Sequence, residues 1–378
     1  MKICIKIIAF CIIFALIGAY SPLLVSAKEI RIGNISAQSA ILIEAESGKA
    51  LYEKNANKKM PMASTTKIMT AIVAIESGIA LDKIVKIPAG AVGVEGSSAY
   101  LAEGELVTFE ALLYALLLSS ANDSAVAIAY EICSSLEGFV QKMNEKASDI
   151  GLADTHFTNP HGLDNTDHYT SARDMAILMS YCVKNKLFLT ISGCKKKVFP
   201  RDDGGVRVMI NHNRLLKMND YVIAGKTGFT KKSGRCLVSC AERDGTRLIC
   251  VTFNAPNDWN DHENLYEFGF ESYETVFFDP LEFTIPIVSG QKNDLKVESN
   301  GFSLFLPRNR DNIQIIVEAP RFLYARVNTG EQVGQIRYVC DGRTVGISPL
   351  YATETVEKAT YKFNLFEWLI DLFKGIFN

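Results

Sequence analysis

Residues 61–75 of this 378-residue chain read PMASTTKIMTAIVAI, and this stretch places the first helix of the main domain. Apolar side chains recur in it at helical spacing: Ile68, Met69, Ile72, Val73 and Ile75. Gly78 supplies a C-terminal stop, so we expect a helix that begins near Ser64. Ser64 and Lys67 are three residues apart, which would put both side chains on one face of that helix.

A hydroxyl and an amine in this arrangement can act as a nucleophile and its base. A lysine removes the proton from a serine when burial or a neighbouring cation lowers the lysine pKa. The start of a helix also favours developing negative charge on Ser64. The pattern S-x-x-K is short, however, and a serine that opens a helix is more commonly its N-cap.

Two more polar clusters lie downstream. Ser120-Ala121-Asn122 lies between apolar helices expected over 109–118 and 124–133, and its hydroxyl and carboxamide could relay a proton and bind an amide. Lys226-Thr227-Gly228 ends an expected strand, where a cation and a hydroxyl could hold a carboxylate and the glycine would admit a substrate backbone. Taken singly, the first could be a helix cap and the second a surface strand end.

The surrounding pattern indicates an α+β fold. A hairpin is expected over 40–52, helices over 136–150 and 172–184, two strands over 235–253 around Asp244-Gly245, and a final helix over 263–273. Strands at both ends with helices between them predict an antiparallel sheet covered by helices and assembled from distant parts of the chain.

The C-terminal third differs from the rest. Residues 277–356 show β-type alternation and predict a small all-β domain. In the segment 357–378 that follows, polar residues recur at helical spacing: Glu367, Asp371, Lys374 and Asn378. The broad apolar face left between them predicts an amphipathic helix that lies in a membrane interface; the alternative is a helix packed on the β domain.

The N-terminal segment reads as a signal for export. Lys2 and Lys6 precede an apolar run over 7–19, and Val25-Ser26-Ala27 fits a signal-peptidase site, which predicts cleavage after Ala27. The alternative is an uncleaved anchor, but the run is shorter than the roughly 20 residues that cross a bilayer. The predicted domains are therefore a signal peptide over 1–27, a main domain over 28–276, the β domain and the tail.

Composition excludes some classes of function. With 48% hydrophobic and 22% charged residues the chain has the composition of a globular protein, and a net charge of −2 gives no basis for binding nucleic acid. Seven cysteines follow the signal, an odd number, without a C-x-x-C or Cys/His cluster at metal-ligand spacing. We expect no metal or cofactor, and we expect Cys236 and Cys240 to be buried on one face of a strand.

The order of the three clusters is more informative than any one of them. S-x-x-K opening a helix, S-x-N between helices and K-T-G on a later strand form the set found in class A β-lactamases and penicillin-binding proteins. The chain resembles the low-molecular-mass penicillin-binding proteins, which are serine-type D-alanyl-D-alanine carboxypeptidases. The resemblance extends to residues 61–70, to 159–164 with 171–176, and to the β domain and tail.

The resemblance implies a role for each cluster. Ser64 would attack the carbonyl between two D-alanines of a peptidoglycan stem peptide, with Lys67 as proton acceptor, and water would open the acyl-enzyme. Ser120 would relay the proton to the leaving amine, and Asn122 would hold the substrate amide.

The third cluster would bind the end of the peptide. Lys226 and Thr227 would hold its terminal carboxylate, and Gly228 would let its backbone approach. The backbone N–H groups of Ser64 and Phe229 would form the oxyanion hole.

The same resemblance implies that β-lactams acylate Ser64, and that the enzyme lies outside the cell, peripherally on the outer face of the cytoplasmic membrane. Three departures from related patterns stand out. Ala121 replaces the aspartate of β-lactamases, Phe229 replaces a histidine of some relatives, and residues 257–261 lack an arginine that helps some relatives to hold the carboxylate.

Three alternatives remain. A β-lactamase would also be acylated but would clear the penicilloyl group quickly. A catalytically silent wall-binding protein would keep the fold without turnover. A Ser-His-Asp enzyme using His161 or His212 is disfavoured, because no serine is surrounded by G-x-S-x-G.

Overall fold

The structure is a computed structural model that describes residues 32–360 and Ile370. The expected signal peptide lies outside this range, as do residues 361–369 and 371–378 of the expected tail helix. Residues 357–360, where that helix was expected to begin, are not helical, because Lys358 forms an isolated β-bridge with Gly290. Among the described residues, no helix is long and apolar enough to cross a membrane.

The main domain is built on a five-stranded antiparallel sheet in the order β2-β1-β9-β8-β7. Its strands are β1 (Ser39–Glu44), β2 (Ala50–Lys54), β7 (Val222–Thr230), β8 (Gly234–Arg243) and β9 (Thr246–Phe253). The N-terminal hairpin joins the C-terminal strands where Ile41 lies opposite Val251. This confirms the sheet assembled from distant parts of the chain, and it leaves β7 at one edge.

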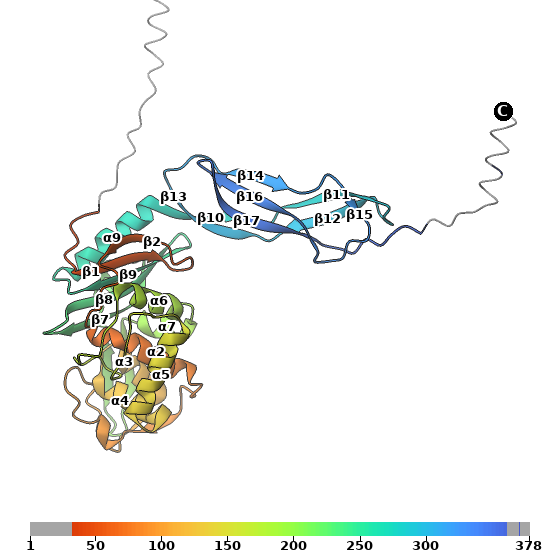
Figure 1. Cartoon of the computed structure of the whole chain (residues 1–378). Helices are drawn as coiled ribbons and strands as arrows, with labels where there is room; N and C mark the ends of the chain where they lie inside the picture. The colour runs from red at the N-terminus through yellow and green to blue at the C-terminus, as the bar shows by residue number, and fades with distance from the viewer. Residues whose placement is uncertain (1–31, 361–369, 371–378) are drawn as a thin grey trace, which may run out of the picture. The chain divides into compact units, whose positions relative to one another are not determined.

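Alternate residues of the strands enter two separate cores. Ile41 and Ile43 of β1 pack with the helical core on one face, whereas Ala40 and Leu42 pack on the other. The helices are α2 (Lys67–Glu76), α3 (Phe109–Leu117), α4 (Asn122–Cys133), α5 (Leu136–Asp149), α6 (Ala172–Cys182), α7 (Lys186–Ser192), α8 (Leu215–Met218) and α9 (Asp258–Ser272). Helix α6 packs on β1 and β9, and α9 covers the opposite face (Figure 1).

Two helices begin earlier than the sequence predicted. Helix α4 starts at Asn122, and α9 starts at Asp258 although the pattern predicted residue 263. The buried residues at the start of α9 are polar: Asp258, Asp261 and His262. The apolar spacing used to predict helices was therefore absent there. Acidic side chains are favourable there because the N-terminal end of a helix carries partial positive charge.

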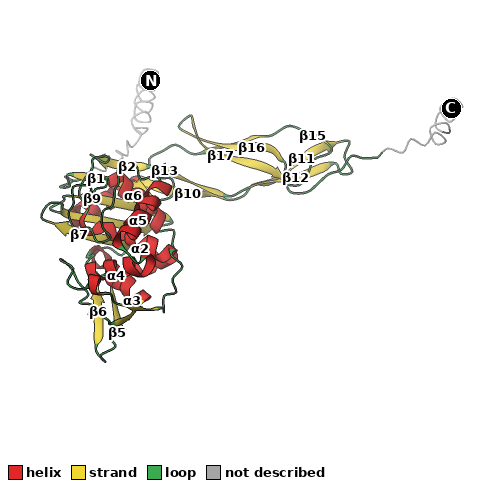
Figure 2. Cartoon of the chain, turned by 60° about the horizontal axis from the view of Figure 1, so that its bottom comes forward, coloured by secondary structure: helices red, strands yellow, loops and turns green. Residues whose placement is uncertain are grey.

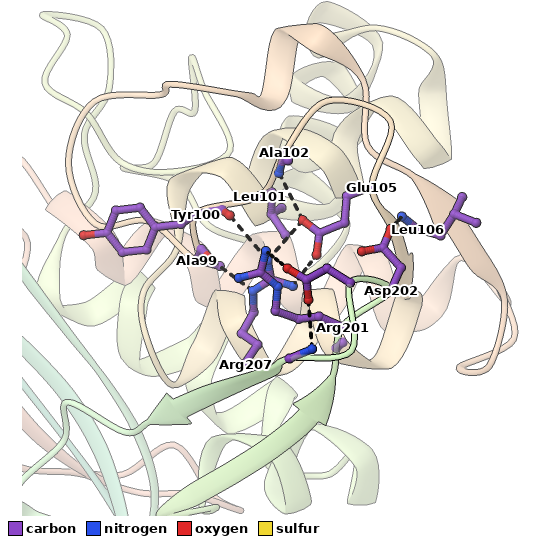
Figure 3. A network of polar contacts seen from close by, with 12 residues as sticks. Ala99, Tyr100, Leu101, Ala102, Glu105, Leu106, Arg201, Asp202 and Arg207 are labelled. Carbon is purple, nitrogen blue, oxygen red and sulfur yellow. Dashed lines mark hydrogen bonds and ion pairs between the residues drawn. The ribbon is translucent and has the colours of Figure 1, made fainter.

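A hairpin that the sequence analysis missed lies beside the helical core. Strands β5 (Lys196–Pro200) and β6 (Val206–Ile210) form it (Figure 2). A separate two-stranded sheet pairs β3 (Ile84–Lys86) with β4 (Leu106–Thr108). Arg207 of β6 makes two hydrogen bonds to the Glu105 carboxylate and donates to the Ala99 carbonyl oxygen (Figure 3). Both charged side chains are buried, so this ion pair fastens the hairpin to the segment over 98–105.

The C-terminal region is all β, as predicted. Strand β10 (Tyr273–Phe278) pairs with β13 (Phe302–Pro307). A six-stranded sheet in the order β14-β16-β17-β12-β11-β15 contains β11 (Glu282–Val288), β12 (Asp294–Ser299), β14 (Gln314–Glu318), β15 (Leu323–Tyr324), β16 (Gln332–Cys340) and β17 (Arg343–Ala352). Two small apolar clusters, one around Leu295 and Val297 and the other around Ile336 and Tyr338, form its core.

The cysteines of the described residues are all free thiols: Cys133, Cys182, Cys194, Cys236, Cys240, Cys250 and Cys340. Cys236 and Cys240 both lie in the helical core on one face of β8, as expected. Burial raises the pKa of Cys236 to about 12, so this thiol is inert at neutral pH. No group of three metal-ligating side chains occurs within residues 32–360.

Candidate active site

Ser64 lies on a single 3-10 turn, η1 (Ala63–Thr66), that leads into α2. The N-cap positions of η1 and α2 are Met62 and Thr66, and neither makes a side-chain cap, so Ser64 is not the helix cap that the alternative interpretation required. Ala63 before it has a left-handed backbone with φ of 46°. The turn leaves Ser64 partly exposed while both neighbouring residues are buried.

Lys67 is fully buried and makes three polar contacts. Its Nζ lies 3.0 Å from Ser64 Oγ, 2.6 Å from Asn122 Oδ1 and 2.5 Å from the His161 carbonyl oxygen. Burial, followed by the neighbouring Lys226 charge, lowers the pKa of Lys67 well below its usual value. The amine therefore has a strong tendency to be neutral while it touches the serine hydroxyl.

Asn122 is held from both sides. Its Nδ2 donates to the Glu95 carbonyl oxygen at 2.5 Å and its backbone N–H donates to Ser97 at 2.7 Å. Gly96 has a φ of +96°, and a Cβ there would lie 2.8 Å from Asn122 Nδ2. Asp123 accepts hydrogen bonds from the backbone of the same segment, which keeps Oδ1 of Asn122 directed at Lys67.

The segment over 159–164 completes the surroundings of Lys67. Thr70 Oγ1 donates to the Pro160 carbonyl oxygen at 2.6 Å, one residue before the carbonyl that binds Lys67. Gly162 has a φ of +93°, and a Cβ on it would lie 1.9 Å from the Ala63 carbonyl oxygen. Only glycine therefore lets this segment lie against η1.

Ser120 and Lys226 form a second group. Ser120 lies in the turn between α3 and α4 with a left-handed φ of 58°, and its Oγ accepts a hydrogen bond from Lys226 Nζ at 3.0 Å. Lys226 also donates to the Thr227 carbonyl oxygen at 2.8 Å. Burial lowers the pKa of Lys226 to about 7. Among the described residues, no hydrogen bond joins this group to the Ser64–Lys67 group.

Strand β7 brings Gly228 of the third cluster next to Ser64. A Cβ on Gly228 would lie 3.0 Å from the Ser64 backbone nitrogen and 3.1 Å from the Met62 carbonyl oxygen. Because β7 is the edge strand, one row of its backbone N–H groups faces away from β8. Phe229 is 66% exposed, so its side chain is not buried against the turn, and the role expected of this residue is that of its backbone N–H.

The two histidines considered for a Ser-His-Asp enzyme, His161 and His212, make no hydrogen bond to Ser64 among the described contacts. Burial and the Lys67 charge lower the pKa of His161 to about 3, and burial and Lys226 lower the pKa of His212. His262 contacts Ser239, with Nδ1 and Oγ 2.7 Å apart, but both side chains are fully buried beneath α9. That pair is closed to solvent and belongs to the core.

None of the described pockets is lined by a residue of the three clusters. A pocket of about 240 Å³ lies between the β5–β6 hairpin and residues 98–100 and reaches Ser119, next to Ser120. Larger pockets, of about 420 and 560 Å³, lie by the β1–β2 turn and α6 and contain none of the three clusters. The convergence of Ser64, the amines of Lys67 and Lys226, and the edge strand β7 is therefore a better indication of the candidate site than pocket volume.

The structure brings Ser64, Lys67 and Asn122 together and places Gly228 beside Ser64, but the sequence analysis missed the backbone groups that support them. The sequence did not identify the carbonyl oxygens of Glu95 and His161 as part of the site. The glycines beside them, Gly96 and Gly162, are the one local signal that could have pointed there, because both have positive φ and both adjoin another backbone or side chain closely.

The chain is similar to known proteins in sequence and in fold. Residues 25–257 match the family described as D-alanyl-D-alanine carboxypeptidase, and residues 280–358 match the C-terminal domain of penicillin-binding protein 5. The chain is 32% identical to D-alanyl-D-alanine carboxypeptidase DacF of Bacillus subtilis, over 86% of this chain and 87% of that protein. It is also 32% identical to DacA of Escherichia coli K12, over 91% and 88%.

Solved structures of related proteins have a similar fold. Penicillin-binding protein 5 from Haemophilus influenzae superposes with a TM-score of 0.72 at 27% identity, over 87% of this chain and all of that chain. The DD-transpeptidase of Streptomyces K15 superposes with a TM-score of 0.61 at 31% identity, over 64% of this chain and 99% of that chain.

Proposed function

The chain belongs to the D-alanyl-D-alanine carboxypeptidase family, and we propose that it removes the terminal D-alanine from peptidoglycan stem pentapeptides through an acyl-enzyme on Ser64. The observation that carries this proposal is the environment of Lys67. A neutral amine has two N–H donors, and two carbonyl oxygens, of Asn122 and His161, lie within hydrogen-bond distance of it. Its lone pair is then left for the Ser64 hydroxyl.

Acylation follows from that arrangement. Lys67 accepts the hydroxyl proton as Ser64 Oγ attacks the carbonyl carbon of the penultimate D-alanine. The backbone N–H groups of Ser64 and Phe229 stabilise the oxyanion, which the close packing of β7 on η1 supports.

The leaving group needs a proton when the peptide bond breaks. Ser120 relays to the departing D-alanine amine the proton that Lys67 took from Ser64, so that Lys67 is neutral again and Ser120 keeps its hydroxyl. Lys226, whose Nζ lies 3.0 Å from Ser120 Oγ, holds that hydroxyl in place. Water then attacks the ester, and the proton taken from water restores the Ser64 hydroxyl as the shortened peptide leaves.

Residues of the second and third clusters bind the substrate on either side of the bond that is cleaved. Lys226 and Thr227 bind the terminal carboxylate, Gly228 admits the peptide backbone, and Asn122 binds the amide on the acyl side. A bound carboxylate beside Lys226 raises the pKa of that amine above the value of about 7 that burial gives it, so substrate binding keeps the cation charged.

Labelling with a fluorescent penicillin tests the nucleophile. We expect a long-lived adduct on the wild-type protein and none on Ser64→Ala. Rapid turnover of the drug would contradict the carboxypeptidase proposal in favour of a β-lactamase.

Release of D-alanine from a stem pentapeptide tests turnover directly. A purified protein that is labelled by penicillin yet releases no D-alanine would support the wall-binding alternative instead.

The family acts at the cell wall, and we further propose export, with the mature enzyme held peripherally on the outer face of the cytoplasmic membrane by its C-terminal tail. The sequence pattern of residues 357–378 supports this. Fractionation of cells that express the full chain or a chain ending at residue 360 tests it: the full chain should sediment with membranes, and the shorter chain should not. Equal distribution of both would contradict it.

A further inference from the structure

Strand β8 places an arginine next to the proposed carboxylate site. Arg235 pairs with Phe229 across the β7–β8 ladder, and Leu237 pairs with Thr227. Residues directly opposite in an antiparallel pair share a face, so Arg235 and Thr227 lie diagonally on the same face of the sheet. A diagonal separation of about 7–8 Å between such positions is within reach of a long side chain.

The Arg235 side chain contacts two residues at the start of α9, Asp258 and Trp259. Its Nε and Nη2 lie 2.9 and 2.8 Å from Asp258 Oδ1, and its guanidinium carbon lies 5.3 Å from the centre of the Trp259 ring. The Asp258 side chain is only 3% exposed, whereas that of Arg235 is 42% exposed. The arginine is therefore anchored on one side and open to solvent on the other.

The free side of Arg235 can still bind a ligand. No residue that the structure describes accepts a hydrogen bond from its Nη1. A guanidinium offers a planar fork that fits a carboxylate, and Asp258 uses only one edge of it. Trp259 and Asp258 lie in the stretch over 257–261 that has no arginine of its own, so the same stretch anchors an arginine from β8 instead.

We propose that Arg235 is a substrate-binding residue that, together with Thr227, holds the terminal carboxylate of the peptide, and that Asp258 positions it. This inference rests on the proposed function and adds the residue that selects acyl donors ending in a free carboxylate. An ion pair that only joined β8 to α9 would affect stability and leave that selectivity unchanged.

The test compares two substrates that differ only in the carboxylate. A stem peptide ending in D-alanyl-D-alanine and its C-terminal amide are cleaved by wild type, Arg235→Ala and Arg235→Lys. For Arg235→Ala we expect kcat/KM on the free acid to fall roughly 10- to 100-fold, the range for losing a hydrogen bond to a charged group, with the amide changed less than about threefold. Arg235→Lys should retain part of the preference for the acid.

Arg243→Ala is the matched control. Arg243 lies on the same strand, pairs with Glu271 and lies over the rings of Tyr221 and Phe270, but it is at the far end of β8 from Thr227. It should leave both substrates unchanged. Equal losses on acid and amide in Arg235→Ala, or no loss on either, would overturn the proposal.

A second readout does not depend on D-alanine release. Acylation of Ser64 by benzylpenicillin and by its methyl ester is followed by mass spectrometry, and Arg235→Ala should slow the acid but not the ester. If wild type releases no D-alanine, the proposed function fails, while the ratio of these two rates still decides the role of Arg235.

Discussion

Lys67 Nζ lies 3.0 Å from Ser64 Oγ, and both of its other polar partners are carbonyl oxygens. The proposed role of Lys67 as a base at neutral pH requires such a contact. Burial and the charge of Lys226 lower the pKa of Lys67 well below its usual value, and in the neutral amine the two carbonyls would accept both N–H groups and leave the lone pair for the hydroxyl.

Replacing Lys67 by methionine should abolish most acylation while keeping the volume of the side chain. We expect the rate of penicillin labelling to fall by about 10²- to 10⁴-fold, the usual contribution of a positioned general base. Stopped-flow or gel-based labelling measures it. Lys83→Met, at a half-exposed surface ion pair with Glu131, is the control and should label normally; an equal loss in both variants would contradict the assignment.

Gly162→Ala should damage both stability and the site. The new Cβ would overlap the Ala63 carbonyl oxygen at 1.9 Å in a backbone with positive φ, so either η1 or the 159–164 segment must move. We expect a lower melting temperature and slower labelling of Ser64. Gly151→Ala, with a φ of +78° and no atom within 4 Å of the added carbon, isolates the backbone strain alone, about 1–2 kcal/mol. Matching effects at both positions would show that the contact with Ala63 is unimportant.

The pH profile should depend on the substrate carboxylate. In the free enzyme the pKa of Lys226 is about 7, so above this pH the amine loses its charge and binds a carboxylate less well. We expect kcat/KM for the free-acid peptide to decline above about pH 7, while kcat declines only at higher pH because bound substrate raises the Lys226 pKa. At acidic pH, protonation of Lys67 should lower both kcat and kcat/KM, because the neutral amine is the proposed base.

The C-terminal amide is the control for that profile. It has no carboxylate for Lys226 to bind, so its kcat/KM should lack the decline near pH 7. Profiles that superimpose for acid and amide would rule out a charge-dependent role for Lys226.

Arg207→Ala should loosen the β5–β6 hairpin. Removing one partner of a buried ion pair leaves Glu105 charged and without its guanidinium, which costs about 3–5 kcal/mol. Thermal unfolding should shift accordingly, and labelling should slow because residues 95–101 carry the contacts that orient Asn122. Arg243→Ala removes an exposed ion pair of about 0–1 kcal/mol and serves as the comparison. Equal melting temperatures for the two variants would contradict this account.

Much of the fold followed from periodicity and turn chemistry. The hairpin at 40–52, the helices α3, α5 and α6, and the β8–β9 hairpin around Asp244-Gly245 all have strong local patterns, and the structure confirms them. The sequence analysis did not predict strands β5 and β6. In β6 the apolar residues Val206 and Val208 are exposed while the charged Arg207 between them is buried, so the usual apolar pattern of a strand is missing. The hairpin is held instead by Glu105, which is distant in sequence.

By itself the sequence determined which groups could do the chemistry: Ser64, Lys67, Ser120, Asn122, Lys226 and Thr227 stand in short motifs whose order is informative. Only the tertiary structure decided what surrounds them. The carbonyl oxygens of Glu95 and His161 belong to the backbone, which looks the same at every residue, so no side-chain pattern could mark them. Arg235 likewise became a candidate ligand only when the sheet register set it diagonal to Thr227 and the first turn of α9 brought Asp258 to it.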